Sequence, residues 1–212
     1  GGTSGGGAGT WDLTTTNPWW DPIGAADVAW SNAGFDIAIF GGTAGTVTLG
    51  VPITAGGLTF NTSGYTITGS TLTLKPPTGS STPVIAVNGI GSRVTISSIL
   101  PGTAGFAKTG DGALVLTNNG NTFSGDLVIN AGSLVITNAG QLGTGTTAIS
   151  VNGFANPGSP GFSGGQLVLQ GGITGAGLTI SREISVTGRG PGAANSTGGL
   201  ISIGNNTLSG NF

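Results

Sequence analysis

A short phrase recurs along the chain: glycine, one variable residue, leucine, valine, and then leucine or isoleucine. It begins at Gly112, Gly125, Gly132 and Gly165. In an extended backbone, apolar residues two positions apart lie on one face, and a strand this short cannot bury that face by itself. Repetition of such units is typical of stacked folds in which each unit covers its neighbour. The phrase therefore predicts a solenoid.

Pairs of apolar residues two positions apart continue from Val47 to Ile203, with glycine turns between them. The intervals between pairs are uneven, which disfavours hairpins, because hairpins need regular short turns. The pattern favours a coil of about three short strands and about twenty residues per turn, in which one corner can lengthen. We therefore expect an all-β chain that folds as a right-handed parallel β-helix. A β-sandwich or barrel is the alternative.

Composition favours a folded chain and removes several kinds of chemistry. The 212 residues include 45 glycines and only 6% charged residues, with a formal net charge of −2. Abundant β-branched residues favour strands over disorder. The absence of cysteine and histidine excludes disulfides, thiol or imidazole catalysis and the usual zinc sites. Scattered lysines and arginines form no basic patch for nucleic acid, and no apolar run is long enough for a transmembrane helix.

The beginning of the chain differs from the rest. Residues 1–45 are rich in glycine and tryptophan, whereas residues 46–212 carry the repeated strands. We expect an irregular cap followed by one β-helical domain, which continues in a longer parent chain. Large aromatic residues either cover the open end of such a core or form an exposed platform for glycans. The candidates for both roles are Trp11, Trp19, Trp20 and Trp30.

Residues 108–125 combine Lys-Thr-Gly-x-Gly-x-Leu-x-Leu with a later Asn-x-Phe-Ser-Gly. This stretch resembles the passenger-associated repeat of autotransporters. Residues 126–136 continue the resemblance, except at Asp126, where the family usually has a small residue or threonine. The segment from Trp11 to Phe60 is similar to the opening of such passengers. The resemblance implies a β-helical passenger on the outer surface of a Gram-negative bacterium, or released from it.

The acidic residues suggest two kinds of site, and turns or caps explain most of them. Calcium could be held by an early group whose spacing matches no known calcium loop, namely Asp12, Asp21, Asp27 and Asp36. A polysaccharide-degrading enzyme would need two carboxylates at a defined separation. The central charged residues imply no such pair; they are Arg93, Lys108, Asp111, Asp126, Arg182 and Glu183. We expect no catalytic residue, no cofactor and no bound metal.

These observations predict a non-enzymatic rod with a structural or adhesive role. The alternative is a polysaccharide-binding or polysaccharide-degrading β-helix. Surface glycans, or ligands on host or neighbouring cells, are the expected partners of the loops at residues 76–77 and 157–161. Homotypic association, end to end or side by side, would use the apolar residues of the last strands. These residues are Ile201, Ile203, Leu208 and Phe212. Asparagines that follow the strands are expected to stack into ladders of side-chain amides.

Overall fold

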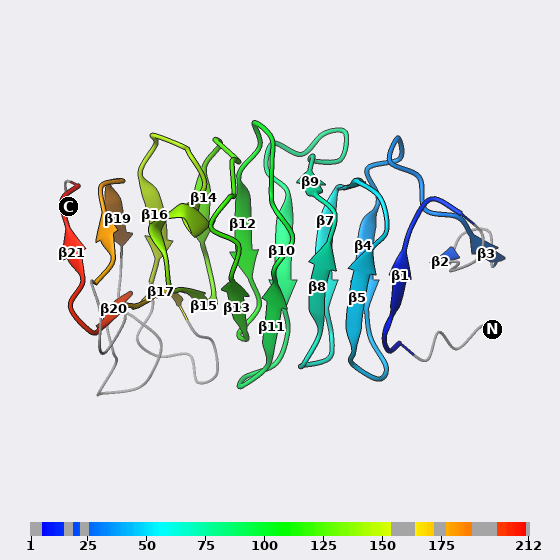
Figure 1. Cartoon of the computed structure of the whole chain (residues 1–212), viewed down its shortest axis with the longest axis horizontal. Coiled ribbons are helices and arrows are strands. Elements are labelled where there is room, and N and C mark those ends of the chain that lie inside the picture. The colour runs from blue at the N-terminus through cyan, green and yellow to red at the C-terminus, as the bar shows by residue number, and fades with distance from the viewer. Residues whose placement is uncertain are drawn as a thin grey trace.

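A computed structural model describes residues 6–14, 19–21, 26–153, 164–171, 177–187 and 199–210. Two long sheets, in both of which neighbouring strands are parallel, dominate this part of the chain (Figure 1). The eight-stranded sheet has the spatial order β1 (Gly9–Trp11), β5 (Thr46–Leu49), β8 (Thr66–Gly69), β11 (Arg93–Ile96), β13 (Ala113–Leu116), β15 (Gly132–Ile136), β17 (Gly165–Gln170) and β20 (Leu200–Ile203). The seven-stranded sheet has the order β4 (Ile37–Phe40), β7 (Gly57–Phe60), β10 (Val84–Val87), β12 (Phe106–Thr109), β14 (Leu127–Ile129), β16 (Ile149–Asn152) and β19 (Ile184–Thr187).

Three small sheets and one short helix complete the described elements. β6 (Ile53–Ala55) pairs with β9 (Leu72–Leu74) in parallel, as β18 (Thr179–Ile180) does with β21 (Thr207–Leu208). β2 (Trp19–Asp21) and β3 (Ala26–Val28) form an antiparallel pair near the N-terminus. The helix is a 3₁₀ turn, η1 (Ala139–Leu142), capped by the side chain of Asn138.

From β4 onward the chain passes between the two long sheets in alternation, and each strand pairs with the strand one turn later. In the eight-stranded sheet Val94 lies beside Leu114, and Leu114 lies beside Leu134, so about twenty residues form a turn there. Leu134 then pairs with Leu167, because the intervening turn is longer. The all-β prediction is confirmed, and the long parallel sheets agree with a β-helix. We call each turn of this coil a layer.

The recurring phrase places its leucines and its valine on opposite faces of a strand. Leu114, Leu134 and Leu167 are fully buried in the space between the sheets. The valines of the phrase point the other way, yet they are also buried and form a second cluster with Ala113 and Ile201 packed against them. They are Val115, Val135 and Val168. The phrase therefore supplies apolar contacts to both faces of the eight-stranded sheet.

The third side of the coil is less regular than the expected three strands per turn. Within the described residues it forms strands only at the β6–β9 and β18–β21 pairs. Elsewhere backbone hydrogen bonds outside any strand join successive layers, such as Thr122 N–H to Leu100 O and Thr144 N–H to Phe123 O. Segments rich in asparagine and glycine run along this side, and these residues favour turns over strands.

The boundary at residue 45 between a cap and a β-helical domain stays a prediction. Two strands that precede it, β1 and β4, already belong to the eight-stranded and seven-stranded sheets. β1 pairs with β5, and β4 pairs with β7, in the same parallel register as the later layers.

The asparagine prediction is confirmed at two places beside the seven-stranded sheet. Asn88 donates from Nδ2 to Oδ1 of Asn61 at 2.8 Å, and Asn152 donates to Oδ1 of Asn130 at 2.7 Å. Three members directly follow a strand and Asn152 is the last residue of β16, so within each pair one amide lies above the other in the next layer. The two ladders are separated by the layer of β12, where Gly110 follows the strand and has no side chain.

Candidate functional site

The segment from β12 to β15 holds the resemblance noted in the sequence, and a buried lysine lies inside it. Lys108 is fully buried, and its Nζ donates to the carbonyl oxygens of Thr109 and Gly110 at 2.8 Å and of Ala131 at 3.1 Å. Burial lowers the pKa of Lys108 to about 7, and the nearby Asp111 carboxylate opposes this shift. Because Ala131 belongs to the next layer, the ammonium group joins two layers of the coil.

The glycines of the same segment allow the backbone of neighbouring layers to approach closely. Gly110 has φ +74°, and a Cβ built there would lie 2.3 Å from Val87 O. Gly132 has φ +62°, and its Cβ would lie 2.3 Å from Gly112 O. Any other residue would have to adopt a left-handed conformation and displace the backbone of the layer before it. Gly110 and Gly132 are thus required by stacking as well as by the turn.

Asn121 connects three consecutive layers on the third side. It is buried; its Oδ1 accepts from Leu100 N–H at 2.9 Å, and its Nδ2 donates to Gln141 O at 2.9 Å. Phe123, two residues later, is buried and contacts Phe106, with ring centroids 5.4 Å apart. The Asn-x-Phe part of the motif therefore holds the irregular side of the coil to the core.

We predict that Asn121→Ala lowers the free energy of unfolding by about 2–3 kcal/mol, because it leaves a buried N–H and a buried C=O without partners. Urea unfolding followed by circular dichroism measures the change. The matched control is Asn61→Ala, which removes one exposed amide contact and should cost less than about 1 kcal/mol. Equal losses in the two variants would contradict the assignment of Asn121.

Arg182 makes a second connection across layers, farther along the third side. Its Nε donates to Thr147 O at 2.6 Å, Nη1 to Leu142 O at 3.1 Å and Nη2 to Gly125 O at 3.3 Å. A Cβ built on Gly145 would lie 2.8 Å from Ser124 O and 3.1 Å from the guanidinium carbon, so a larger residue at this position would crowd the Arg182 side chain. Burial lowers the pKa of Arg182, opposed by the Asp126 carboxylate.

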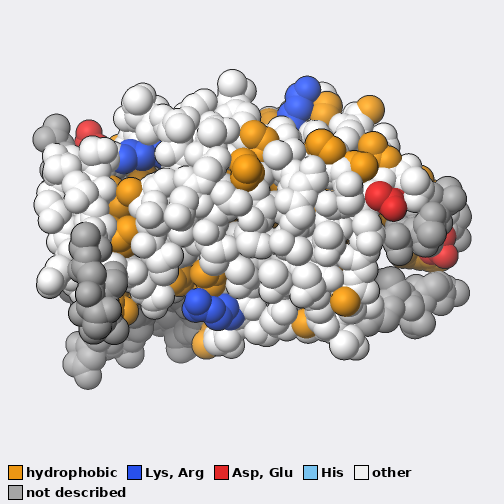
Figure 2. Space-filling view, viewed as in Figure 1, with side chains coloured by type: hydrophobic (Ala, Val, Ile, Leu, Met, Phe, Trp, Pro, Cys, Tyr) orange, Lys and Arg blue, Asp and Glu red, His pale blue; other side chains and the backbone are white. Residues whose placement is uncertain are grey.

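The predicted central acids lie near different cations. Asp111 acts on Lys108, and Asp126 acts on Arg182. Both cations donate to backbone carbonyls of the coil, which gives them a structural role. In the ranges that the structure describes, no three acidic residues gather in a way that could hold a metal ion. Charged side chains are few and far apart on the face shown in Figure 2.

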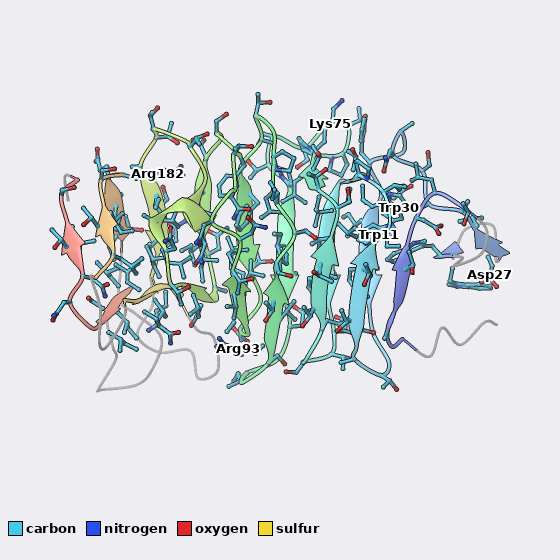
Figure 3. All side chains as sticks on the ribbon, in the orientation of Figure 1. Trp11, Asp27, Trp30, Lys75, Arg93 and Arg182 are labelled. Atoms are coloured by element: carbon cyan, nitrogen blue, oxygen red, sulfur yellow. The ribbon has the colours of Figure 1, made fainter. Side chains whose placement is uncertain are left out.

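Three of the four tryptophans form one cluster at the N-terminal end of the core. Trp11 is 1% exposed and Trp30 is 6% exposed, and both point into the coil (Figure 3). Ring centroids of Trp11 lie 4.8 Å from those of both Trp19 and Trp30. Phe40 joins the cluster to the core, since its ring lies 5.8 Å from Trp11 and stacks on the ring of Phe60 at 4.7 Å.

The tryptophans differ in exposure. Trp20 is half-buried and alternates with Trp19 along β2, so the two side chains lie on opposite faces of the β2–β3 pair. Trp30 donates from Nε1 to Thr54 O at 3.1 Å, whereas Nε1 of Trp11 is buried without an acceptor in the described structure. These positions favour a role in the core for Trp11 and Trp30.

The predicted association surface lies at the C-terminal edges of the sheets. Ile201 packs against the outer valine cluster, Ile203 is 41% exposed, and Leu208 is half-buried against the core. Phe212 lies outside the described residues. Among the described strands, β19 and β20 are the terminal members of their sheets, and β21 pairs with β18.

One of the two predicted contact loops can be placed. Residues 76–77 follow Lys75, whose Nζ lies 4.2 Å from the centroid of the Phe35 ring in a cation–π contact. The backbone of Phe35 is in the left-handed region, with φ 53°, which residues other than glycine rarely adopt. The loop at residues 157–161 lies outside the described residues.

No described helix is long and apolar enough to cross a membrane.

A family model for the passenger-associated-transport-repeat matches residues 106–136, which run from the start of β12 to the end of β15. These residues form a passenger-associated transport repeat. The match covers two neighbouring strands of each long sheet, which is about one and a half turns of the coil at about twenty residues per turn. It contains Lys108, Asn121 and the glycines described above. The resemblance to autotransporter passengers is confirmed.

The chain is also similar to the adhesin BmaC autotransporter of Brucella suis biovar 1 (strain 1330). The two are 42% identical over 211 residues, which is 96% of this chain and 6% of that protein. The chain therefore spans a small part of the length of this relative. The search of solved structures found none that matches this chain. The predicted location on the outer surface of a Gram-negative bacterium is confirmed by the two matches.

Proposed function

We propose that the chain is a segment of an adhesive, non-enzymatic passenger that forms a rigid rod outside the cell. In this proposal the coil is a right-handed parallel β-helix, with the tryptophan cluster as the cap at its N-terminal end. Such a rod presents its loops and sides to other surfaces at a distance from the membrane.

The stacking of parallel strands along one axis is the observation that carries this proposal (Figure 1). Layers joined by backbone bonds, amide ladders and buried cations resist local unfolding, because each layer is held by both neighbours. The similarity to a protein named an adhesin supports contact with other surfaces as the purpose of the rod. The role of Lys108 and Arg182 in holding layers together supports a non-enzymatic chain.

The adhesive role is tested with latex beads that carry the purified chain. We expect such beads to attach to cultured epithelial cells several times more often than beads that carry the Leu134→Asp variant. Leu134 is fully buried, so this variant leaves a charge in the core and disrupts the layers. Equal attachment of both kinds of bead would contradict adhesion by the folded coil. Release of reducing ends from a polysaccharide by the chain would contradict a non-enzymatic role.

Homotypic association is a second part of the proposal. The terminal strands β19 and β20 carry exposed apolar residues, including Val186 at 43% and Ile203 at 41% exposure. Electron microscopy over a concentration series tests it: end-to-end filaments that Ile203→Lys abolishes would support association through this edge. Single short rods at every concentration would contradict it.

A further inference from the structure

Successive layers on the third side of the coil are joined by backbone hydrogen bonds, with one interruption. Thr122 N–H donates to Leu100 O, Thr144 N–H to Phe123 O, and Thr207 N–H to Leu178 O. Between residues 139–146 and β18, no backbone hydrogen bond joins the described residues. The connection there is made by the Arg182 side chain.

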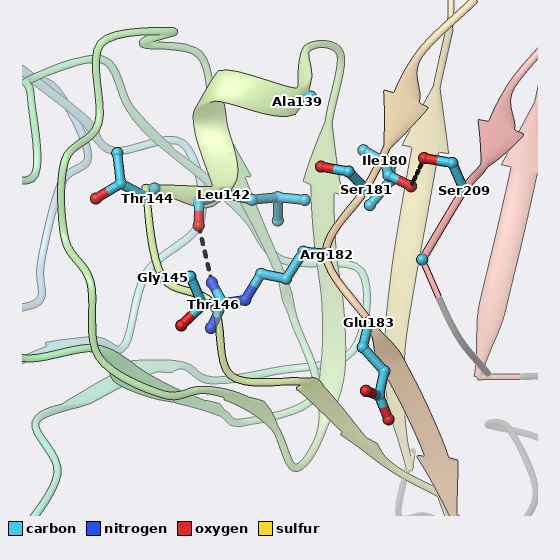
Figure 4. A pocket seen from close by; sticks show the side chains of 12 residues that line it. Ala139, Leu142, Thr144, Gly145, Thr146, Ile180, Ser181, Arg182, Glu183 and Ser209 are labelled. Atoms are coloured by element: carbon cyan, nitrogen blue, oxygen red, sulfur yellow. Dashed lines mark hydrogen bonds between the residues drawn. The ribbon is translucent and has the colours of Figure 1, made fainter.

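A cavity of about 610 Å³ lies at this interruption (Figure 4). One wall is formed by residues 142–146 and the other by residues 180–183. We call this cavity the slot. Hydroxyl groups and backbone line most of it, with the side chains of Thr144 and Ser181 on opposite walls.

The backbone of β18 has hydrogen-bonding capacity that faces the slot. Its pairing with β21 uses alternate carbonyls, since Leu178 O accepts from Thr207 N–H and Ile180 O accepts from Ser209 N–H. In a parallel strand the residues between these point their N–H and C=O groups to the other side. The N–H and C=O of Thr179 and the N–H of Ser181 are therefore directed away from β21, toward the layer of η1, whereas the Ser181 carbonyl lies beside Gly210 on the side of β21.

Two charged side chains line the slot: Arg182 is hydrogen-bonded within the wall, and Glu183 faces solvent. The guanidinium of Arg182 is directed at carbonyl groups of Thr147, Leu142 and Gly125 and forms part of the wall. Glu183 is exposed and lines the slot, and Figure 4 shows its carboxylate turned away from Arg182. The rim therefore carries a solvent-facing negative charge, and the whole chain has a net charge of −2.

We propose that the slot binds an extended peptide segment of a partner protein, with a lysine or arginine of that segment beside Glu183. The segment adds a strand between the two layers and pairs its backbone with Thr179 and Ser181. One residue of a strand occupies roughly 4.8 Å between strands, 10 Å between sheets and 3.3 Å along the strand. The slot volume of about 610 Å³ therefore holds on the order of four residues. This inference rests on the proposed adhesive role and names the class of partner.

A saccharide is the other ligand that hydroxyl-lined walls could hold. The observations favour a peptide, because a strand supplies N–H and C=O groups at the spacing that β18 presents, whereas sugar hydroxyls do not repeat at that spacing. Maltotriose therefore serves as the competing probe.

The test is a titration of the isotope-labelled chain, observed by nuclear magnetic resonance. The probe is an acetylated six-residue peptide of alternating threonine and valine, with one lysine replacing a threonine. We expect it to shift the amide signals of Thr179 and Ser181 and to slow their hydrogen exchange at least tenfold. The same peptide with glutamate in place of lysine should bind at least fivefold more weakly, and Glu183→Gln should remove this difference.

Two variants distinguish binding in the slot from binding elsewhere. Ser181→Trp places a large ring in the slot and should abolish the shifts, whereas Ser81→Trp, in an exposed loop, should leave them unchanged. Circular dichroism confirms that both variants remain folded. Unchanged amide signals on addition of the peptide, equal binding by Ser181→Trp, or shifts caused by maltotriose and not by the peptide would overturn the proposal. Bead adhesion without peptide binding would leave the proposed function standing and remove this inference alone.

Discussion

Replacing Trp11 with alanine is expected to lower the free energy of unfolding by about 3–5 kcal/mol. The ring is 1% exposed and contacts Trp19, Trp30 and Phe40, so its removal opens a cavity at the end of the core. The layers nearest the N-terminus should lose hydrogen-exchange protection first, because each layer depends on its neighbours. Urea unfolding followed by circular dichroism gives the magnitude, and hydrogen exchange locates the loss.

Trp20→Ala is the matched control for this prediction. Trp20 is half-buried and follows Trp19 on the other face of β2, so its removal should cost less than about 1 kcal/mol. Retention on an immobilised glycan column separates a cap from a glycan platform. A platform requires that Trp11→Ala lose retention while its stability stays unchanged, and that result would contradict the cap.

The sequence predicts the strands of the coil well, because the apolar pairs and glycine turns mark each layer locally. The four places where the phrase occurs all contain strands, and the pairs at Leu58, Val94 and Ile149 are strands in the seven- or eight-stranded sheet. The Lys-Thr-Gly motif correctly predicts the repeat of residues 106–136. These features depend on residues within one layer or on neighbouring layers with the same pattern.

β12 is absent from the sequence prediction, because its inward-pointing position holds a lysine. Lys108 pairs in register with Ile85 before it and Ile129 after it, and both of these are fully buried. An apolar-x-apolar pattern does not include a charged residue in this position. The spacing between layers does identify β12. Lys108 lies about twenty residues before Ile129, which is one turn of the coil, so the two residues occupy the same position in neighbouring layers.

The slot and the Arg182 contacts also depend on register between layers, and local patterns do not reveal them. Arg182 and Glu183 are consecutive, and the sequence predicts only that they point in opposite directions. Their positions depend on the numbers of residues before and after β17, which the strand pattern does not set. Leu142 and Gly125 receive the Arg182 hydrogen bonds although they lie 40 and 57 positions away in the chain.

The free energy of unfolding is expected to rise with pH between about 7 and 10.5, because of Lys108. Its pKa is lowered from 10.5 to about 7 in the folded chain, chiefly by burial. Between these values the unfolded chain holds a proton that the folded chain has released, so raising the pH favours folding by up to about 1.4 kcal/mol per unit. Below pH 7 both states are protonated, and Lys108 contributes no slope. Urea unfolding at pH 6, 7, 8 and 9 measures the effect.

No histidine or cysteine side chain contributes to the pH dependence in this range, because the chain contains neither residue. Lys108→Met should remove the slope, whereas Lys75→Met changes an exposed lysine and should preserve it. The three carbonyl oxygens around Nζ favour the ammonium form, and burial favours the neutral amine. A flat profile for the unmodified chain would mean that the carbonyls dominate, so that Lys108 remains a charged link between layers. A rising profile would mean that burial dominates, and the coil would then be more stable in mildly alkaline than in neutral surroundings.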